Sequence, residues 1–220
     1  MVHDWRELAE RTLRVRAALP PASATPLTES QTREVEQRYA VTLPAGYRDF
    51  LLQIDSGGHG PDLGLRRLRQ GPDGWAWEGA RTDPASVAKP FPDQAEISGR
   101  LDALVEPDEY GSPAWRDWDT RCGAIVAEQT DGTITFSGDD TFPMLLVVTG
   151  PQRGAVWCDL RATTEALAPV RNPDGSAATF TDLYVSWLVT AERLLAGGQA
   201  VLRPADIRTP MIEACFRGHP

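Results

Sequence analysis

Apolar residues recur at helical spacing in the first quarter of the chain. Tyr47, Phe50, Leu51 and Ile54 fall at positions i, i+3, i+4 and i+7, which predicts one apolar stripe on a short amphipathic helix. Pro44 precedes this stripe, at a place where a first helical turn tolerates a missing N–H. We therefore expect a buried helix that begins at Pro44 and ends before the glycines that follow Asp55.

Three further segments have helix signals at their starts. Asp4 is a suitable N-cap for a helix that extends to Leu19, with Trp5 and Leu8 on one face. The Thr28–Gln31 spacing is that of a capping box, which predicts a helix to about Tyr39. A last helix, with Thr181 as its N-cap, is predicted to extend to Leu195. Its expected inward residues are Tyr184, Trp187, Leu188, Ala191 and Leu195.

Strand-like patterns occupy the middle of the chain. Residues 142–148 are almost wholly apolar, which predicts a strand buried on both faces, and 150–154 turn it into an antiparallel strand over 155–160. A strand from Leu63, a turn at 71–74 and a second short strand to Trp77 are also expected. A further hairpin is predicted, in which Gly123–Val126 pairs with Thr133–Phe136 across Asp131-Gly132.

The remaining segments show little periodicity. Residues 78–120 combine many acids with prolines and glycines, so we expect a loop with short irregular helix, held to the core by Trp115 and Trp118. Residues 199–220 could form a strand or lie against the surface. The order of helices, strands and a final helix predicts an α+β fold with helices on one side of a largely antiparallel sheet. The predicted divisions are an N-terminal helix (1–19), a Pro-rich linker (20–27), the α+β domain (28–196) and a C-terminal extension (197–220).

A set of short motifs resembles the SUKH superfamily, the fold of the yeast cell-wall-assembly regulators and of many bacterial immunity proteins. The resemblance covers about residues 28–195 and implies the same α+β fold in a protein-binding role. The residues that carry it are Leu43, Pro44, Tyr47, Phe50, Gly57, Gly58, Gly60, Pro61, Gly64, Gly150, Pro151, Gly154, Trp157, Asp159, Tyr184 and Trp187.

Charge is unevenly distributed along the chain. The formal net charge is −9, and residues 73–140 hold fifteen acidic against five basic side chains, so the surplus lies in the middle third. Such a field repels the phosphates of nucleic acids and membranes and favours a basic partner. No stretch has the ~20 apolar residues of a membrane span, and Asp4, Glu7 and Glu10 interrupt the N-terminus, so a cytoplasmic protein is expected.

The same third contains four of the seven tryptophans. Aromatic residues beside acids are typical of contact sites for basic proteins, although core packing is the ordinary role of tryptophan. We expect the Trp-Arg-Asp-Trp-Asp run at 115–119 to be the centre of such a site. The candidate partner-binding residues are Trp75, Trp77, Asp108, Glu109, Trp115, Asp117, Trp118 and Asp119.

The sequence contains few of the residue patterns that are typical of catalytic or metal-binding sites. His59 is the one histidine away from the termini, and Ser56, which precedes Gly57-Gly58, lacks the GxSxG context of a nucleophile. Cys122, Cys158 and Cys215 form no CxxC or Cys/His cluster, and the acidic pairs, such as Asp139-Asp140, lack calcium-loop spacing. No catalytic residue, metal or cofactor is therefore predicted.

The leading hypothesis is a non-enzymatic binding module, by resemblance an immunity protein that neutralises a basic toxin by occlusion. The alternative is a regulatory or scaffold protein with an endogenous partner. A third possibility is an enzyme that uses His59 with nearby carboxylates.

Overall fold

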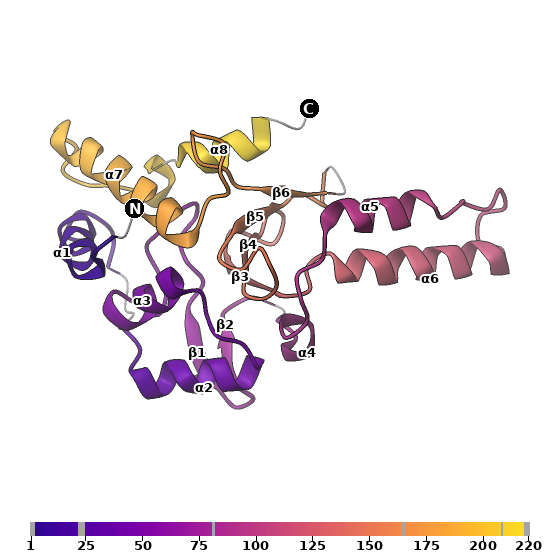
Figure 1. Ribbon diagram of the computed structural model, residues 1–220. Helices are drawn as coiled ribbons and strands as arrows, with labels where there is room; N and C mark the ends of the chain where they lie inside the picture. The colour runs from indigo at the N-terminus through magenta and orange to yellow at the C-terminus, as the bar shows by residue number, and fades with distance from the viewer. Residues whose placement is uncertain (1–2, 22–24, 81, 164–165, 208, 218–220) are drawn as a thin grey trace.

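Figure 1 shows the computed structural model, which describes residues 3–21, 25–80, 82–163, 166–207 and 209–217. Its centre is a four-stranded antiparallel sheet with the strand order β3-β4-β5-β6, so each strand pairs with the next along the chain. A separate two-stranded hairpin pairs β1 with β2. The strands are β1 (Leu68–Gly71), β2 (Gly74–Trp77), β3 (Thr133–Ser137), β4 (Met144–Val147), β5 (Val156–Asp159) and β6 (Leu167–Pro169).

The helices gather mainly beside one face of this sheet. In Figure 1, α1, α3 and α7 lie together on the side away from α5 and α6. The helices are α1 (Trp5–Arg16), α2 (Glu29–Tyr39), α3 (Ala45–Gln53), α4 (Pro84–Val87), α5 (Gln94–Asp102), α6 (Pro113–Glu128), α7 (Phe180–Ala196) and α8 (Pro210–Arg217), with a 3-10 turn at Pro204–Asp206. The fold is α+β, as predicted.

Strand β4 shows how the core is divided. All four of its residues are buried, and alternate residues point to opposite faces of the sheet. Met144 and Leu146 belong to the main core with the helices, whereas Leu145 and Val147 join a small cluster on the outer face. That outer cluster also contains Phe91, Trp157 and Leu167. The continuous apolar run therefore forms a strand buried on both faces, as predicted.

Aromatic rings fill the main core between α3 and α7. The Phe50 ring, which has no exposed surface, lies 5.3 Å from the Phe180 ring and 5.2 Å from the Tyr184 ring, measured between centroids. Tyr47 lies 4.9 Å from Phe180. Trp5 brings α1 into the same cluster. The N-terminal helix therefore contributes to the core of the α+β domain.

The predicted helix starts are largely correct. Asp4 caps α1 by accepting the N–H of Arg6, and Thr28 forms the predicted capping box with Gln31. Helix α3 follows Pro44 and buries its predicted stripe. Helix α7 begins two residues earlier than predicted, because Thr179 forms its own capping box with Asp182.

The prediction for residues 78–128 is wrong in one important respect. Gly123–Val126 is part of helix α6, so the hairpin with Thr133–Phe136 does not exist and β3 pairs with β4. Ser112 caps this helix, and Pro113 occupies its first turn. About half of the segment predicted as a loop with short irregular helix belongs to the regular helices α4, α5 and α6.

Two other predictions need correction. The strand expected from Leu63 begins at Leu68, and Leu63 itself is largely exposed. The C-terminal segment forms a 3-10 turn and α8, which contributes Ile212 and Cys215 to the core. Part of the Pro-rich linker (22–24) and the last residues (218–220, including His219) lie outside the described residues.

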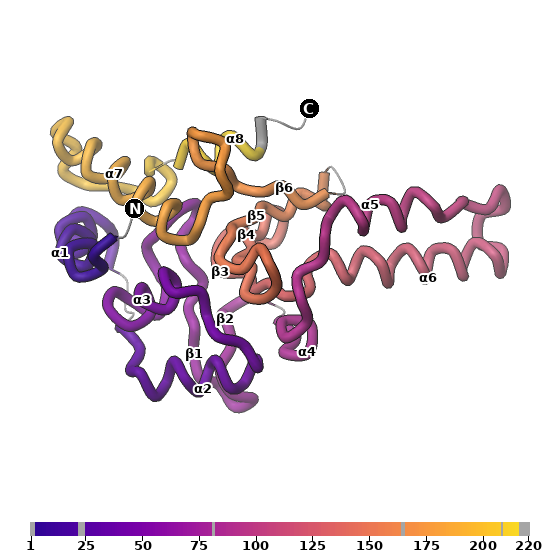
Figure 2. Tube along the Cα trace, in the orientation of Figure 1, coloured from indigo at the N-terminus to yellow at the C-terminus, as the bar shows by residue number. Residues whose placement is uncertain are grey.

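The most distinctive feature of the molecule is a projecting helical hairpin. Helices α5 and α6 run side by side and extend away from the sheet, and the segment that joins them lies at the far end (Figures 1 and 2). No residue of α6 is fully buried, and only Ile97 of α5 is. We call residues 94–128 the arm and residues 105–119 the arm tip.

Candidate functional site

The arm tip brings together six of the eight predicted partner-binding residues. Asp108 and Glu109 lie in the segment that joins the two helices, and Trp115 to Asp119 form the first turns of α6. Tryptophans at the tip of a projecting hairpin cannot anchor a loop to the core, so that prediction is wrong. The residues concerned are Asp108, Glu109, Trp115, Asp117, Trp118 and Asp119.

An aromatic cluster stabilises the tip. The Trp115 ring lies 4.5 Å from the Tyr110 ring and 5.9 Å from the Trp118 ring, measured between centroids. Tyr110 is 83% exposed, whereas both tryptophans are half-buried. The Trp115 indole N–H donates to Glu106 at 3.4 Å. These rings therefore present apolar surface to solvent although they also pack against one another.

Acidic side chains surround these rings. The arm holds eight acidic and three basic residues. Asp117 is 73% exposed at its side chain, and its one ion pair among the described residues is a 3.9 Å contact with Arg121. Surface pairs of this kind are weak, so the carboxylate remains available to a partner. The tip therefore combines exposed aromatic surface with negative charge.

Trp75 and Trp77, the other two predicted partner-binding residues, are core residues. Trp77 is 1% exposed and donates its indole N–H to the Tyr47 hydroxyl at 2.7 Å. Trp75 is 6% exposed and donates to Glu34 at 3.0 Å. Side chains buried in this way offer almost no contact surface, which narrows the candidate set to the six residues of the arm tip.

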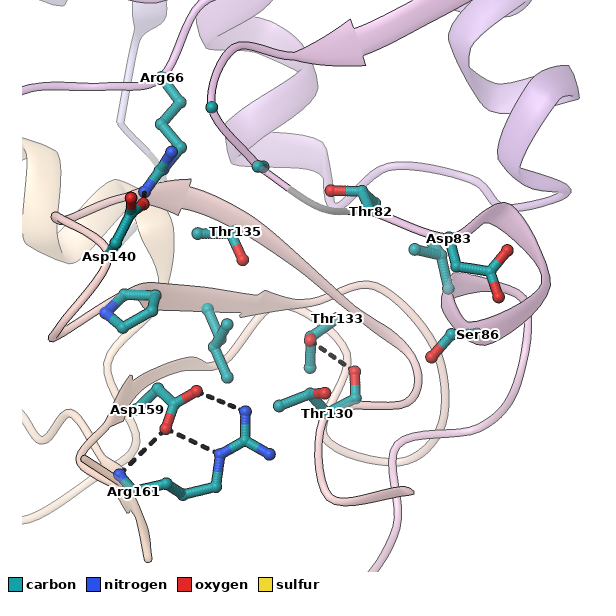
Figure 3. Close-up of a pocket in the computed structure, with 15 residues that line it drawn as sticks. Arg66, Thr82, Asp83, Ser86, Thr130, Thr133, Thr135, Asp140, Asp159 and Arg161 are labelled. Carbon is teal, nitrogen blue, oxygen red and sulfur yellow. Dashed lines mark hydrogen bonds and ion pairs between the residues drawn. The ribbon is translucent and has the colours of Figure 1, made fainter. Parts of the chain in front are cut away.

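A polar cleft of about 450 Å³ lies at the root of the arm (Figure 3). Strands β3 and β4 form its floor, α4 and the segment before it form one wall, and the end of β5 closes it. Hydroxyl groups and charged side chains dominate the lining. The polar residues are Arg66, Thr82, Asp83, Ser86, Thr130, Thr133, Thr135, Asp140, Asp159 and Arg161.

Both arginines of the cleft form ion pairs with neighbouring aspartates. Arg161 donates from Nε and Nη2 to the two oxygens of Asp159, at 2.9 and 2.6 Å, and from Nη1 to the carbonyl of Val126 at 3.1 Å. The last contact ties the final turn of α6 to β5, where a cation also complements the helix dipole. Arg66 contacts Asp140 at 3.2 Å on the opposite wall.

The glycine-rich turn after α3 packs tightly beside the cleft. Gly58 and Leu65 exchange two backbone hydrogen bonds, at 2.8 and 2.6 Å, which fold the segment back on itself. Gly57 has φ of +146°, and a Cβ there would lie 2.6 Å from the Cα of Arg67. Only glycine fits such a close approach of two backbones. The turn is therefore a structural element that positions Arg66 at the cleft.

His59 lies in this turn and borders a second hollow that shares Arg66 and Asp140 with the cleft. Burial lowers the pKa of His59, and the nearby charges of Arg16 and Arg67 lower it further. Its Nδ1 has no hydrogen-bond partner among the described residues. A general base needs an aligned nucleophile or orienting group, and none contacts His59 in this part of the chain.

A buried ion pair lies at the start of the same turn. Asp55 has no exposed surface, and its Oδ2 lies 2.5 Å from Nη2 of Arg16 on α1. Burial raises the pKa of Asp55, and the Arg16 charge opposes that shift. The pair joins α1 to the end of α3. Removing one partner would leave an uncompensated buried charge, so its role is structural.

The other motif residues lie mostly in the core. Leu43, Phe50, Tyr184 and Trp187 are at most 1% exposed, and Tyr184 hydrogen-bonds Thr12 at 3.0 Å. Trp157 packs on the outer face of the sheet. The turn residues of the motif are Pro44, Gly60, Pro61, Gly64, Gly150, Pro151 and Gly154. Asp159 is the one motif residue whose carboxylate lines the cleft.

Cys158 and Cys215 lie far apart in the sequence, but the fold brings their thiols together. Cys158 is buried in β5, and α8 places Cys215 beside it, so the neighbouring thiol and burial raise the pKa of Cys158. Within the described ranges, no three His, Cys, Asp or Glu side chains gather as a metal site would require. In the same part of the chain, no helix has the length and apolarity needed to cross a membrane.

Sequence patterns did not indicate the cleft. Its lining comes from residues 66, 79–87, 130–145 and 159–161, which become neighbours only when β3, β4 and β5 pair. Ser86, Thr133 and Arg161 carry no motif that would distinguish them from surface residues.

The family model of the SMI1/KNR4 family (SUKH-1) matches residues 26–182, which is more than half of the chain. The matched region includes the glycine-rich turn, the arm and the four-stranded sheet. Neither the curated proteins nor the solved structures contain a match to this chain.

Proposed function

The chain belongs to the SMI1/KNR4 family (SUKH-1), and from this premise we propose that it is a bacterial immunity protein that neutralises a basic toxin. Membership of the family supports a protein-binding module of the immunity or regulator type. The proposal adds a toxin as the partner, the cytoplasm as the place of action, and occlusion without catalysis as the mechanism.

The observation that carries the proposal is the arm tip. An exposed aromatic cluster bordered by carboxylates, on a hairpin that projects from the body, suits contact with a basic concave surface. A second copy of this chain would suit it poorly, because the arm holds eight acidic and three basic residues and would repel another arm. The partner's chemistry is therefore expected to be basic.

The shape of the arm suggests how occlusion would work. Helix α6 has 16 residues, which at 1.5 Å per residue gives a length of about 24 Å. A hairpin of this length can enter the cleft of an enzyme that acts on nucleic acid and place carboxylates where phosphates would bind. The toxin would be blocked sterically and electrostatically, with no bond formed or broken.

The test is capture of the partner by the tagged full-length chain, with Trp115→Ala as the diagnostic variant. Truncating a tryptophan at the centre of an interface should weaken binding by about 2 kcal/mol or more, mainly through faster dissociation. Val201→Ala is the matched control, because Val201 is 71% exposed and lies outside the arm.

Neutralisation is tested separately. Co-expression of the chain with the captured toxin should restore growth, and Trp115→Ala should reduce that protection. Recovery of an endogenous, non-toxic partner would instead favour the regulatory or scaffold role, and equal capture by Trp115→Ala and the wild type would remove the arm tip from the interface.

A further inference from the structure

The fold places two cysteine thiols on one face of the sheet. Cys158 lies in β5 opposite Ala168 of β6, and residues that face each other across an antiparallel pair point to the same side. Both side chains belong to the main core. The short side chain of Ala168 leaves room beside Cys158 for a side chain from another element.

Helix α8, which lies beside β6 in Figure 1, supplies that side chain. The Cys215 Sγ lies 3.9 Å from the carbonyl oxygen of Pro169, the residue after Ala168, and Cys215 belongs to the same core. The thiols of Cys158 and Cys215 share a hydrogen bond, and both cysteines are free. Sulfurs in contact need only a small displacement to reach the S–S bond length of about 2.05 Å.

Helix α8 is suited to that displacement. It has 8 residues and lies near the end of the chain, where local opening requires little energy. Both thiols are buried in the closed state. Because Cys215 moves with α8, it meets solvent when the helix opens, whereas Cys158 stays in the sheet.

The two thiols differ in acidity. The Cys158 S–H donates to the Cys215 sulfur, which lowers the pKa of Cys215, whereas the neighbouring thiol and burial raise the pKa of Cys158. Cys215 is therefore the first of the two to lose its proton, and the thiolate is the form of cysteine that reacts with oxidants. Cys158 remains a thiol, in position to react with an oxidised Cys215.

We propose that Cys158 and Cys215 form a peroxide-sensitive pair, which closes to a disulfide and holds α8 on the sheet. The Cys215 thiolate attacks one oxygen of hydrogen peroxide, the O–O bond breaks, and a sulfenic acid forms while hydroxide leaves and takes up the proton lost by Cys215. The Cys158 sulfur then attacks Cys215 Sγ, the S–O bond breaks, and water leaves with the Cys158 proton. The two thiols lose two electrons, and the peroxide is reduced to two molecules of water.

The disulfide would close a long loop. Strand β6, helix α7 and the C-terminal 3-10 turn all lie between the two cysteines in the sequence. A cross-link over such a loop stabilises the folded chain by restricting its unfolded forms. In a reducing compartment the pair stays a dithiol, and thiol reductants reopen the disulfide once the oxidant is consumed. This inference goes beyond the proposed function and does not depend on it, because neither cysteine lies on the arm.

The experiment uses the reduced full-length protein. It is exposed to hydrogen peroxide, the remaining thiols are alkylated, and its peptides are mapped by mass spectrometry without reduction. A cross-linked peptide that joins Cys158 to Cys215 is expected, and dithiothreitol should reverse the cross-link. Cys122, which is half-buried on α6, is the internal control and should be recovered in its alkylated form.

Variants separate the roles of the two thiols. Cys158→Ala should stop the reaction at the Cys215 sulfenic acid, which dimedone traps, whereas Cys215→Ala should leave Cys158 unoxidised. Cys122→Ala should form the cross-link as the wild type does. Alanine keeps these positions apolar, and the cross-link in the wild type is a result that needs no variant.

Hydrogen exchange measures whether the disulfide holds α8. Amides of α8 should exchange on the order of tenfold more slowly in the oxidised protein than in the reduced protein, whereas amides of the arm should be unchanged.

The contradicting outcomes are distinct. Oxidation of Cys122 while Cys158 and Cys215 remain thiols, or conversion of Cys215 to a sulfonic acid without a cross-link, would overturn the peroxide-sensitive pair. Equal exchange of α8 in both forms of the protein would show that the disulfide does not hold the helix, and would overturn that part of the proposal.

Discussion

Phe50 is the residue on which the aromatic core depends most directly. It has no exposed surface, and from α3 its ring contacts Trp5 of α1 and both Phe180 and Tyr184 of α7. Phe50→Ala should lower the free energy of unfolding by about 3–5 kcal/mol, because it leaves a cavity among rigid rings. Urea denaturation measures this change. Leu13→Ala, at a position that is 66% exposed, is the control, and a loss below about 1 kcal/mol for Phe50→Ala would contradict the packing described.

The Arg11–Glu192 pair predicts a pH dependence of stability. Arg11 donates two hydrogen bonds to Glu192, at 2.9 and 2.8 Å, and joins α1 to α7. These bonds lower the pKa of Glu192, although partial burial opposes the shift. A lowered pKa in the folded state means that the pair stabilises the fold above the ordinary glutamate pKa of about 4.3 and loses this effect as pH falls through the folded value.

Glu192→Gln should therefore cost up to about 1 kcal/mol at pH 7 and less near pH 3. The comparison is of unfolding free energies for wild type and variant at both pH values. Glu10→Gln, on the exposed part of α1, should show no such narrowing. A constant difference between wild type and Glu192→Gln across this range would show that Glu192 does not stabilise the fold through its charge.

The tryptophans show how far single residues could be assigned from sequence. Trp75 and Trp77 lie two positions apart in a strand, so they share one face, and the pairing of β1 with β2 directs that face into the core. Trp115 and Trp118 lie three positions apart on a helix that leaves the body. Local spacing distinguishes strand from helix, but the choice between core and surface depends on distant segments.

Helix α6 shows the same limit for an element. Its half-buried residues Trp115, Trp118, Cys122 and Ile125 fall at i, i+3, i+7 and i+10, which is a helical stripe. That stripe is hard to recognise in the sequence, because charged residues separate its members in the first turns and the apolar run at 123–127 resembles a strand. The capping box of α2 and the buried strand β4 were predictable because their signals are local and strong.

The arm should open more readily than the body. Its two helices pack mainly on each other, whereas α7 buries six residues in the core. Local opening requires little energy where few apolar contacts are lost. Hydrogen exchange followed by mass spectrometry should therefore show arm peptides exchanging on the order of tenfold faster, or more, than α7 peptides. Equal protection of α6 and α7 would indicate that the arm packs against the body or against another arm in solution.

At the scale of the whole molecule, the surplus of negative charge lies on the arm, away from the hydrophobic core. The arm carries a net negative charge at one end, and α1 lies at the other end in Figure 1. The charge surplus was visible in the sequence, and the fold concentrates it on a projecting surface. Separation of this kind affects the rate at which a partner approaches more than it affects folding stability.

Association kinetics test this arrangement. Asp117→Asn with Asp119→Asn should slow association with the captured basic partner at low salt, because exposed carboxylates steer the approach. Raising the salt to about 0.5 M should remove most of the difference, since the screening length falls to a few ångströms. Surface plasmon resonance separates association from dissociation. Glu7→Gln with Glu10→Gln makes the same charge change on α1 and should have a smaller effect. Association that is independent of salt, and equal for both double variants and the wild type, would place the partner surface away from the arm.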